Sequence, residues 1–333
     1  MKISVSAAMG AVRGRLQLMD ARVLTGQAAG WRRLPQGRTP KRPLLNLAVQ
    51  FGLVWLSVLF FYDICTTWIY DEDRANHLHA LLTGAHKPRE WLWGMLTPWF
   101  PYFFPESAFQ GFVSVTASLF CFAVYWRTGS ARITLAAMLS LGMVSLINES
   151  ARQAFAMSIF CLALQIDRSR VRWPLMVATS LIHTVMLGGT AYVLAARWID
   201  RLARHPARWH MFGWSLVASC AIFMVGFRNG RLTETAIAFF AVQMVGVLML
   251  NHYRFGAAEL TKFVLACTIA SSFFVWTSSG LRGVYLVGVL APFVLPKTGV
   301  MIAFVCLWAY PLAVGETDNF LLVLSHMDDF WWD

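Results

Sequence analysis

Four arginines stand at the ends of apolar runs, where a cation close to a membrane is costly and so predicts a function. Arg152 lies in the segment LINESARQAFA, Arg228 and Arg231 flank a short turn, and Arg282 lies in SSGLRGVY. A guanidinium group presents a planar fork of donors that binds phosphate through two hydrogen bonds. A helix that begins beside it adds backbone N–H groups. The arginines therefore predict a phosphate site; the alternative is that each one anchors a helix end at a membrane surface.

Polar neighbours set Arg152 apart from the other three arginines. Asn148, Glu149 and Gln153 lie within four residues of it, and together they favour a binding site over a simple anchor. His183 lies in the middle of the apolar segment TSLIHTVML. It is either a neutral buried histidine or a proton acceptor at a break in a helix.

Several carboxylates could accept a proton from a sugar hydroxyl: Asp71, Glu72, Asp73, Glu90 and Glu149. The run 71–73 also fits a solvated loop. The nearby histidines and the six scattered cysteines lack the spacing of a metal or disulfide framework. The cysteines fit small core side chains instead. The sequence predicts no metal and no cofactor.

The elements that position these residues are predicted by composition. Hydrophobic residues make up 58% of the chain and charged residues 14%, whereas soluble domains carry about 25% charged residues. Runs of roughly 20 apolar residues must form helices in lipid, because each helix satisfies its own backbone. We expect an all-α, polytopic transmembrane bundle with about nine or ten spans. The expected spans are 44–62, 108–126, 133–147, 148–166, 211–227, 235–251, 259–278, 284–295 and 299–314.

Charge predicts how the bundle is oriented. Residues 1–43 hold nine Lys and Arg against Asp20, which is 9 − 1 = +8 of the net +11. A basic arm before a first span indicates a cytoplasmic N-terminus and argues against a nucleic-acid partner. We expect a flexible arm at 1–43, a membrane domain at 44–315 with an outer loop at 63–107, and an acidic tail at 316–333. The expected location is the bacterial cytoplasmic membrane, which places the four arginines on the outer side.

The segment 174–196 departs from a simple alternation of spans. Arginines flank it on both sides, yet 23 residues (196 − 174 + 1) cannot cross twice, because two crossings need about 40. The segment contains His183 and the pair Gly188–Gly189. We expect a broken or re-entrant hairpin; the alternative is one plain crossing that violates the charge rule.

Two stretches, 69–96 and 146–189, resemble the EpsG family of bacterial polysaccharide-assembly membrane proteins, which are similar to Wzy-type polymerases. The family pattern has an acidic and aromatic outer loop, a Glu before the next apolar stretch, an Arg-Gln-x-x-Ala motif that opens a helix, and a later helix with a central His. Later turns combine Arg with an aromatic residue. The matching residues are Asp73, Glu90, Arg152, Gln153, Ala156, His183, Arg282 and Tyr285.

The resemblance implies a glycosyltransferase that joins oligosaccharide repeat units carried on undecaprenyl pyrophosphate at the outer membrane face. Arg152 would stabilise the pyrophosphate, with Glu90, Glu149 or His183 as the base. The remaining binding residues would be Asn148, Gln153, Arg282, Tyr285, Arg231 and Asp73. Expected partners are the lipid-linked substrate, membrane lipids and other polysaccharide synthesis or export proteins. The alternatives are a flippase for a lipid-linked sugar and a non-catalytic scaffold of a synthase complex.

Overall fold

The structure is a computed structural model, which describes residues 43–61, 91–103, 107–202, 208–228, 241, 243–248, 250, 256–276, 281–295 and 299–313. All regular secondary structure in these residues is helical, as the sequence predicts. The basic arm, most of the outer loop and the acidic tail lie outside the described residues.

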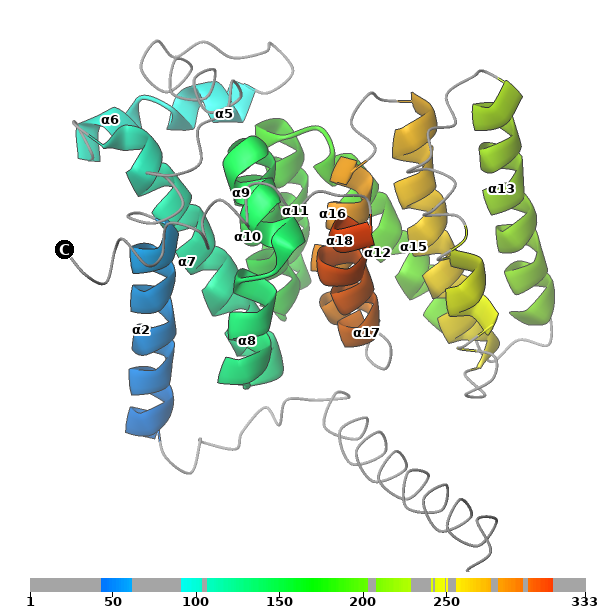
Figure 1. The fold of residues 1–333 in the computed structure, drawn as a ribbon, viewed down its shortest axis with the longest axis horizontal. Helices are drawn as coiled ribbons and strands as arrows, with labels where there is room; N and C mark the ends of the chain where they lie inside the picture. The colour runs from blue at the N-terminus through cyan, green and yellow to red at the C-terminus, as the bar shows by residue number, and fades with distance from the viewer. Residues whose placement is uncertain are drawn as a thin grey trace, which may run out of the picture.

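The chain builds a bundle from long helices, with two short helices at one end. In Figure 1, α5 and α6 lie at the top, where α2 ends and α7 begins, and we call this the α5 end. The helices are α2 (Pro43–Leu59), α5 (Trp91–Leu96), α6 (Trp99–Phe103), α7 (Ala108–Thr128), α8 (Ala131–Met138), α9 (Leu141–Glu149), α10 (Ala151–Gln165), α11 (Ser169–Ile182), α12 (Met186–Leu202), α13 (Arg208–Arg228), α15 (Ala257–Trp276), α16 (Leu281–Val294) and α17 (Gly299–Phe304), followed by the π-helix η3 (Val305–Ala309) and α18 (Tyr310–Ala313).

The expected helix over 133–147 is divided, which corrects the sequence prediction. The chain breaks at Leu139–Ser140, and the Ser140 hydroxyl accepts a hydrogen bond of 3.2 Å from the backbone N–H of Met143. A serine in this position caps a new helix because it satisfies one of the free N–H groups of the first turn. The expected fourth helix likewise begins at Ala151, three residues later than predicted, after a second break at Ser150.

A break is also present in the segment for which a hairpin is expected. Helix α11 ends at Ile182 and α12 begins at Met186. The guanidinium carbon of Arg197, near the end of α12, lies 5.0 Å from the centre of the Trp173 ring, in the first turns of α11. The two helices therefore run antiparallel as a hairpin, and its arms cover 169–202 rather than only 174–196.

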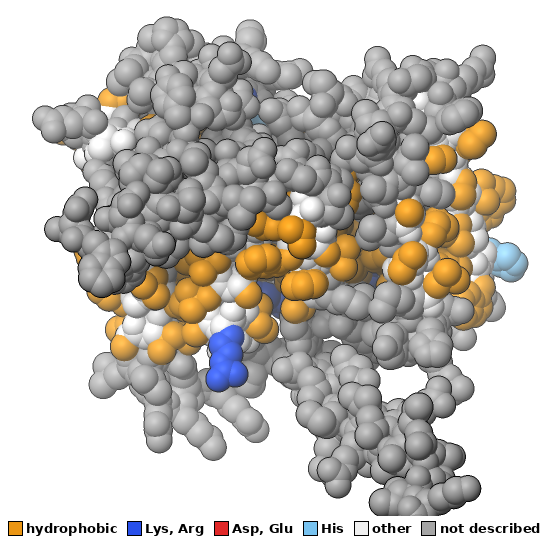
Figure 2. All heavy atoms as spheres, in the orientation of Figure 1, with side chains coloured by type: hydrophobic (Ala, Val, Ile, Leu, Met, Phe, Trp, Pro, Cys, Tyr) orange, Lys and Arg blue, Asp and Glu red, His pale blue; other side chains and the backbone are white. Residues whose placement is uncertain are grey.

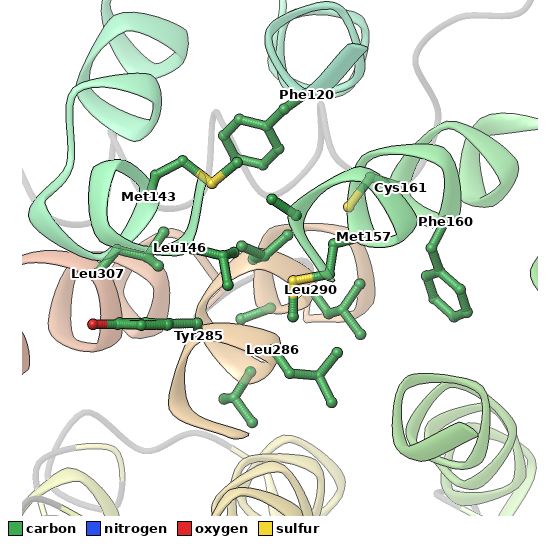
Figure 3. Close-up of a cluster of buried hydrophobic side chains, with 14 of the residues drawn as sticks. Phe120, Met143, Leu146, Met157, Phe160, Cys161, Tyr285, Leu286, Leu290 and Leu307 are labelled. Atoms are coloured by element: carbon green, nitrogen blue, oxygen red, sulfur yellow. The ribbon is translucent and has the colours of Figure 1, made fainter. Parts of the chain in front are cut away.

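The core lies where α7, α9, α10 and α16 meet. Figure 3 shows buried Phe120, Leu146, Met157 and Leu290 from these four helices pointing toward one another. Close helix approach depends on Gly288 of α16: a Cβ built there would lie 2.8 Å from Cβ of Cys306 in η3. Small residues at such crossings let helices pack closely.

Two of the described helices are long and apolar enough to cross a membrane, judged by length and composition. They are Phe109–Thr128 in α7, of which 67% is buried, and Trp209–Gly226 in α13, of which 11% is buried. The first is packed as a core helix, whereas the second directs its apolar side chains outward. Figure 2 shows hydrophobic side chains on the surface of the described residues, including the region of α13.

Candidate functional site

The first turn of α10 holds a cation against an aromatic ring at the α5 end. The guanidinium carbon of Arg152 lies 5.9 Å from the centre of the Trp93 ring. Trp93 belongs to α5 and is fully buried, and Nε of Arg152 is buried as well. A guanidinium group is attracted to the negative face of an indole ring. This contact fixes the sequence-predicted arginine between α10 and the short helix α5.

Trp93 is itself held by two phenylalanines. The ring centres of Phe112 and Phe155 lie 5.2 Å and 6.5 Å from that of Trp93, and 5.3 Å from each other. The indole Nε1 of Trp93 is buried and has no hydrogen-bond acceptor within the described part of the chain. A buried donor without an acceptor is uncommon, so a ligand oxygen at this point would satisfy it.

The polar residues expected around Arg152 are placed in part. Gln153 is fully buried in the first turn of α10. Asn148 and Glu149 form the last turn of α9, immediately before the break at Ser150; their side chains are outside the described set. The Ser150 N–H donates to the carbonyl of Leu146 at 3.0 Å. The break therefore brings the end of α9 and the start of α10, with all four residues, to one corner of the bundle.

His183 occupies the break between α11 and α12 and is 6% exposed. Its Nδ1 accepts a hydrogen bond of 3.3 Å from the backbone N–H of Val185. A nitrogen that accepts from an N–H carries no proton, so the geometry assigns the proton of neutral His183 to Nε2. In this state the lone pair of Nδ1 is engaged by the backbone, and His183 stabilises the turn that begins α12.

Arg152 and His183 lie at the same end of the bundle. The antiparallel pair α10 and α11 is joined by residues 166–168. Counted from Asp167, Arg152 is 15 residues back (167 − 152) and His183 is 16 residues forward (183 − 167). The first turn of α10 therefore lies level with the last turn of α11, as Figure 1 shows for the two green helices near α5.

Of the remaining predicted site residues, Tyr285 is the one whose side chain lies within the described part of the chain. Tyr285 is buried in α16, where its ring lies beside Gly142 of α9, and Figure 3 shows its hydroxyl pointing away from the centre of the cluster. Arg282 lies in the first turn of α16 and Arg228 ends α13; their side chains are outside the described set. Asp73, Glu90 and Arg231 lie outside the described residues.

A buried ion cluster that the sequence predictions miss lies between α12 and α15. Lys262 is 1% exposed, and its Nζ forms ion pairs with Asp200 and, at 3.1 Å, with Glu259. The second carboxylate oxygen of Glu259 and the hydroxyl of Tyr192 are buried without a described hydrogen-bond partner. The sequence signal is Lys262 itself, a charge inside the apolar run AAELTKFVLACTIA. Buried charges are retained only when paired, so the cluster locks α12 to α15.

An apolar cavity of about 120 Å³ lies between α7, α8, α16 and α17. Its walls include Phe120, Ile133, Pro292, Phe304 and Trp308. Catalytic pockets combine apolar walls with a few convergent polar groups, and this cavity has almost none.

Comparison of the chain with protein-family models, with curated proteins and with solved structures finds no match.

Proposed function

We propose that the chain is a multi-span protein of the bacterial cytoplasmic membrane that polymerises lipid-linked oligosaccharide repeat units, as the resemblance to the EpsG family implies. The observation that carries the proposal is the position of Arg152. It is a half-buried cation in the first turn of a bundle helix, and it lies over a buried tryptophan whose donor Nε1 has no acceptor among the described residues.

Exposed apolar surface supports the membrane location. On α13, Trp214 is 73% exposed and Met224 is 59% exposed, and on α2 Phe51 is 71% exposed. A surface helix in water turns a polar face outward, and a large exposed apolar patch marks a protein or membrane contact. Helices with apolar outer faces on opposite sides of the bundle (Figure 1) fit a surrounding lipid phase.

The charge distribution supports the orientation. With the basic arm inside, α2 runs outward, so the α5 end with Arg152 faces the outside. The start of α11 and the end of α12 then face the cytoplasm. The five arginines of residues 167–202 lie near these two helix ends. This arrangement agrees with the enrichment of Lys and Arg on the cytoplasmic side.

The proposed reaction transfers a glycan from its lipid pyrophosphate to a hydroxyl of the next repeat unit. The hydroxyl oxygen forms a bond to the anomeric carbon, and the bond from that carbon to the pyrophosphate oxygen breaks. The pyrophosphate leaves with the electron pair, and the hydroxyl proton passes to a carboxylate, for which Glu149 and Glu90 are the candidates. Arg152 stabilises the charge that builds on the leaving oxygen, and His183 holds the turn that begins α12 in place.

The test is the length distribution of surface and secreted polysaccharide in cells that lack the gene and in cells restored with wild-type protein, Arg152→Ala or Arg132→Ala. Arg132 is an exposed arginine at the opposite end of the bundle, so its variant is the matched control. Membrane levels of each protein are measured in parallel. We expect long polymer from wild type and Arg132→Ala, and single lipid-linked repeat units on the outer face from Arg152→Ala.

Two outcomes in the deletion strain contradict the proposal. Repeat units trapped on the inner face in the deletion strain identify a flippase. Unchanged glycans in the deletion strain exclude a role in polysaccharide assembly. Normal polymer length with Arg152→Ala would remove Arg152 from the mechanism and leave the class of enzyme open.

A further inference from the structure

A group of arginines gathers around one tryptophan at the opposite end of the bundle from Arg152. The guanidinium carbons of Arg197 and Arg172 lie 5.0 Å and 5.8 Å from the centre of the Trp173 ring. Arg201 follows Arg197 by one helical turn on α12. We call Arg172, Trp173, Arg197 and Arg201 the hairpin-base cluster, because it joins the start of α11 to the end of α12.

The segment that contains the cluster carries more positive charge than its acids neutralise. Residues 167–202 contain five arginines against Asp167 and Asp200, which is 5 − 2 = +3. Asp200 is paired with Lys262 of α15. Burial, and after it the charges of Arg172 and Arg201, lower the pKa of Arg197 from its usual value. Cations that crowd one another in this way are stabilised by a bound anion.

The donors left over at the cluster suit a phosphate group. Arg172 uses Nη1 to donate to the carbonyl of Ile166 at 3.4 Å, while its Nε is buried without a described acceptor. The guanidinium carbon of Arg197 lies over the indole ring, 5.0 Å from its centre. A planar fork of this kind binds phosphate oxygens in pairs.

An apolar stripe leads from the cluster along α12. Leu187, Leu194 and Trp198 are 60%, 50% and 59% exposed. They are spaced i, i+7 and i+11, and Arg201 follows at i+14, so all four share one face of the helix. Asp200 falls on another face, toward α15. The surface therefore presents an apolar stripe that ends in cations. This arrangement complements a lipid with an acyl chain and an anionic headgroup.

We propose that the hairpin-base cluster binds the phosphate of an anionic phospholipid whose acyl chain lies along the α12 stripe. The inference rests on the proposed membrane location but not on the transferase reaction. The lipid would hold the two arms of the broken hairpin together at the cytoplasmic surface, where anionic lipids attract basic side chains.

The test is native mass spectrometry of the full chain in detergent, titrated with dioleoyl-phosphatidylglycerol, with dioleoyl-phosphatidylcholine or with inorganic phosphate. We expect wild type to retain phosphatidylglycerol in preference to phosphatidylcholine. Arg197→Gln should weaken retention of phosphatidylglycerol about fivefold. Arg132→Gln, which removes an exposed arginine elsewhere, is the matched control and should leave retention unchanged. Trp198→Ala should weaken both lipids, because it removes part of the shared apolar stripe.

Three results would overturn the inference. Equal weakening by Arg132→Gln shows general attraction rather than a site. Unchanged retention by a folded Arg197→Gln protein, checked by circular dichroism, removes the cluster from lipid binding. Displacement of phosphatidylglycerol by millimolar inorganic phosphate identifies a site for a soluble phosphate compound. Polysaccharide length is measured in the same variants. Because the cluster lies at the opposite end of the bundle from Arg152, a failure of lipid binding can be distinguished from a failure of the proposed reaction.

Discussion

Lys262 of α15 forms ion pairs with Asp200 of α12 and with Glu259 one turn earlier in its own helix. Lys262 is almost fully buried, the side chain of Glu259 is 14% exposed and that of Asp200 is 58% exposed. The two carboxylates therefore need the ion pair with Lys262 to different degrees. Water can solvate Asp200 if the pair is lost, but it can reach Glu259 only in part. The structure makes Lys262 the member on which the contact between the hairpin and α15 depends.

Lys262→Met is expected to lower the free energy of unfolding by about 3 kcal/mol, because the carboxylate of Glu259 then remains buried without a cation. Asp200→Asn is expected to cost less, since Asp200 is half exposed and water screens its pairing. Thermal melting of the purified protein in detergent measures both. The double variant Lys262→Met/Glu259→Gln should recover part of the loss; no recovery would show that packing rather than charge dominates.

Gly142→Ala is expected to destabilise the protein by about 1–3 kcal/mol through overpacking. A Cβ on Gly142 would lie 2.9 Å from the ring of Tyr285 and 3.1 Å from the backbone Cα of Leu307, which cannot move easily. Gly213→Ala is the matched control, because nothing lies within 4 Å of a Cβ built on Gly213 in α13. There the change should stabilise slightly, as alanine favours helix over glycine. Equal melting temperatures for the two variants would contradict this packing.

Run length and composition predict the long helices well. The expected spans 108–126 and 259–278 correspond to α7 at Ala108–Thr128 and α15 at Ala257–Trp276. The break within 174–196 is also predictable, because arginines on both flanks disagree with a plain crossing. The pair Gly188–Gly189 does not mark its position, since both glycines lie inside α12. The break at Ser140 is not predictable in this way, since a single hydroxyl that caps α9 leaves the apolar pattern almost unchanged.

The candidate site is predictable only in its local part. Arg152 and Gln153 stand out because polar groups interrupt an apolar run. Trp93 does not, because 59 residues (152 − 93) separate it from Arg152 and no periodic pattern links them. The same holds for the hairpin-base cluster, in which Trp173 meets Arg197 only after the chain folds back at His183. Contacts of this kind form only in the tertiary structure. A local sequence pattern does not reveal them, because the two residues are far apart in the chain.

His183→Asn is expected to keep polymer length within about twofold of wild type, because an asparagine oxygen can accept the Val185 N–H in place of Nδ1. His183→Ala removes that acceptor and should cost about 1 kcal/mol of stability, as the loss of a helix cap does. Thermal melting and the polysaccharide length assay on both variants check this. Loss of polymer with a stable His183→Asn protein would instead assign His183 a chemical step.

Cys220 tests the membrane location. It is exposed and lies within the apolar helix Trp209–Gly226, so in lipid it should not react with a charged maleimide, which does not enter hydrocarbon. We expect no labelling of Cys220 in open membrane fragments and full labelling after denaturation, measured by peptide mass spectrometry. A cysteine introduced as Arg132→Cys, at a helix start, is the control and should react in the membrane. Equal rates at the two positions would place α13 in water.

The contact between Arg152 and Trp93 predicts that a conservative substitution of Arg152 slows the reaction even when the positive charge is kept. Arg152→Lys keeps the charge but loses the planar fork and most of the contact with the ring. We expect about tenfold slower polymerisation, the effect of losing roughly 1.4 kcal/mol of transition-state stabilisation.

Trp93→Phe separates positioning from charge. It keeps an aromatic ring among Phe112 and Phe155 but removes the buried Nε1 donor and weakens the cation–ring attraction. We expect shorter polymer and a lower melting temperature, because the smaller ring leaves a cavity at a fully buried position. A pulse of labelled repeat unit, followed by gel analysis of chain length, gives the rate for both variants. Wild-type rates from Arg152→Lys would show that charge alone suffices, and the ring of Trp93 would then be a packing element of α5 with no part in orienting Arg152.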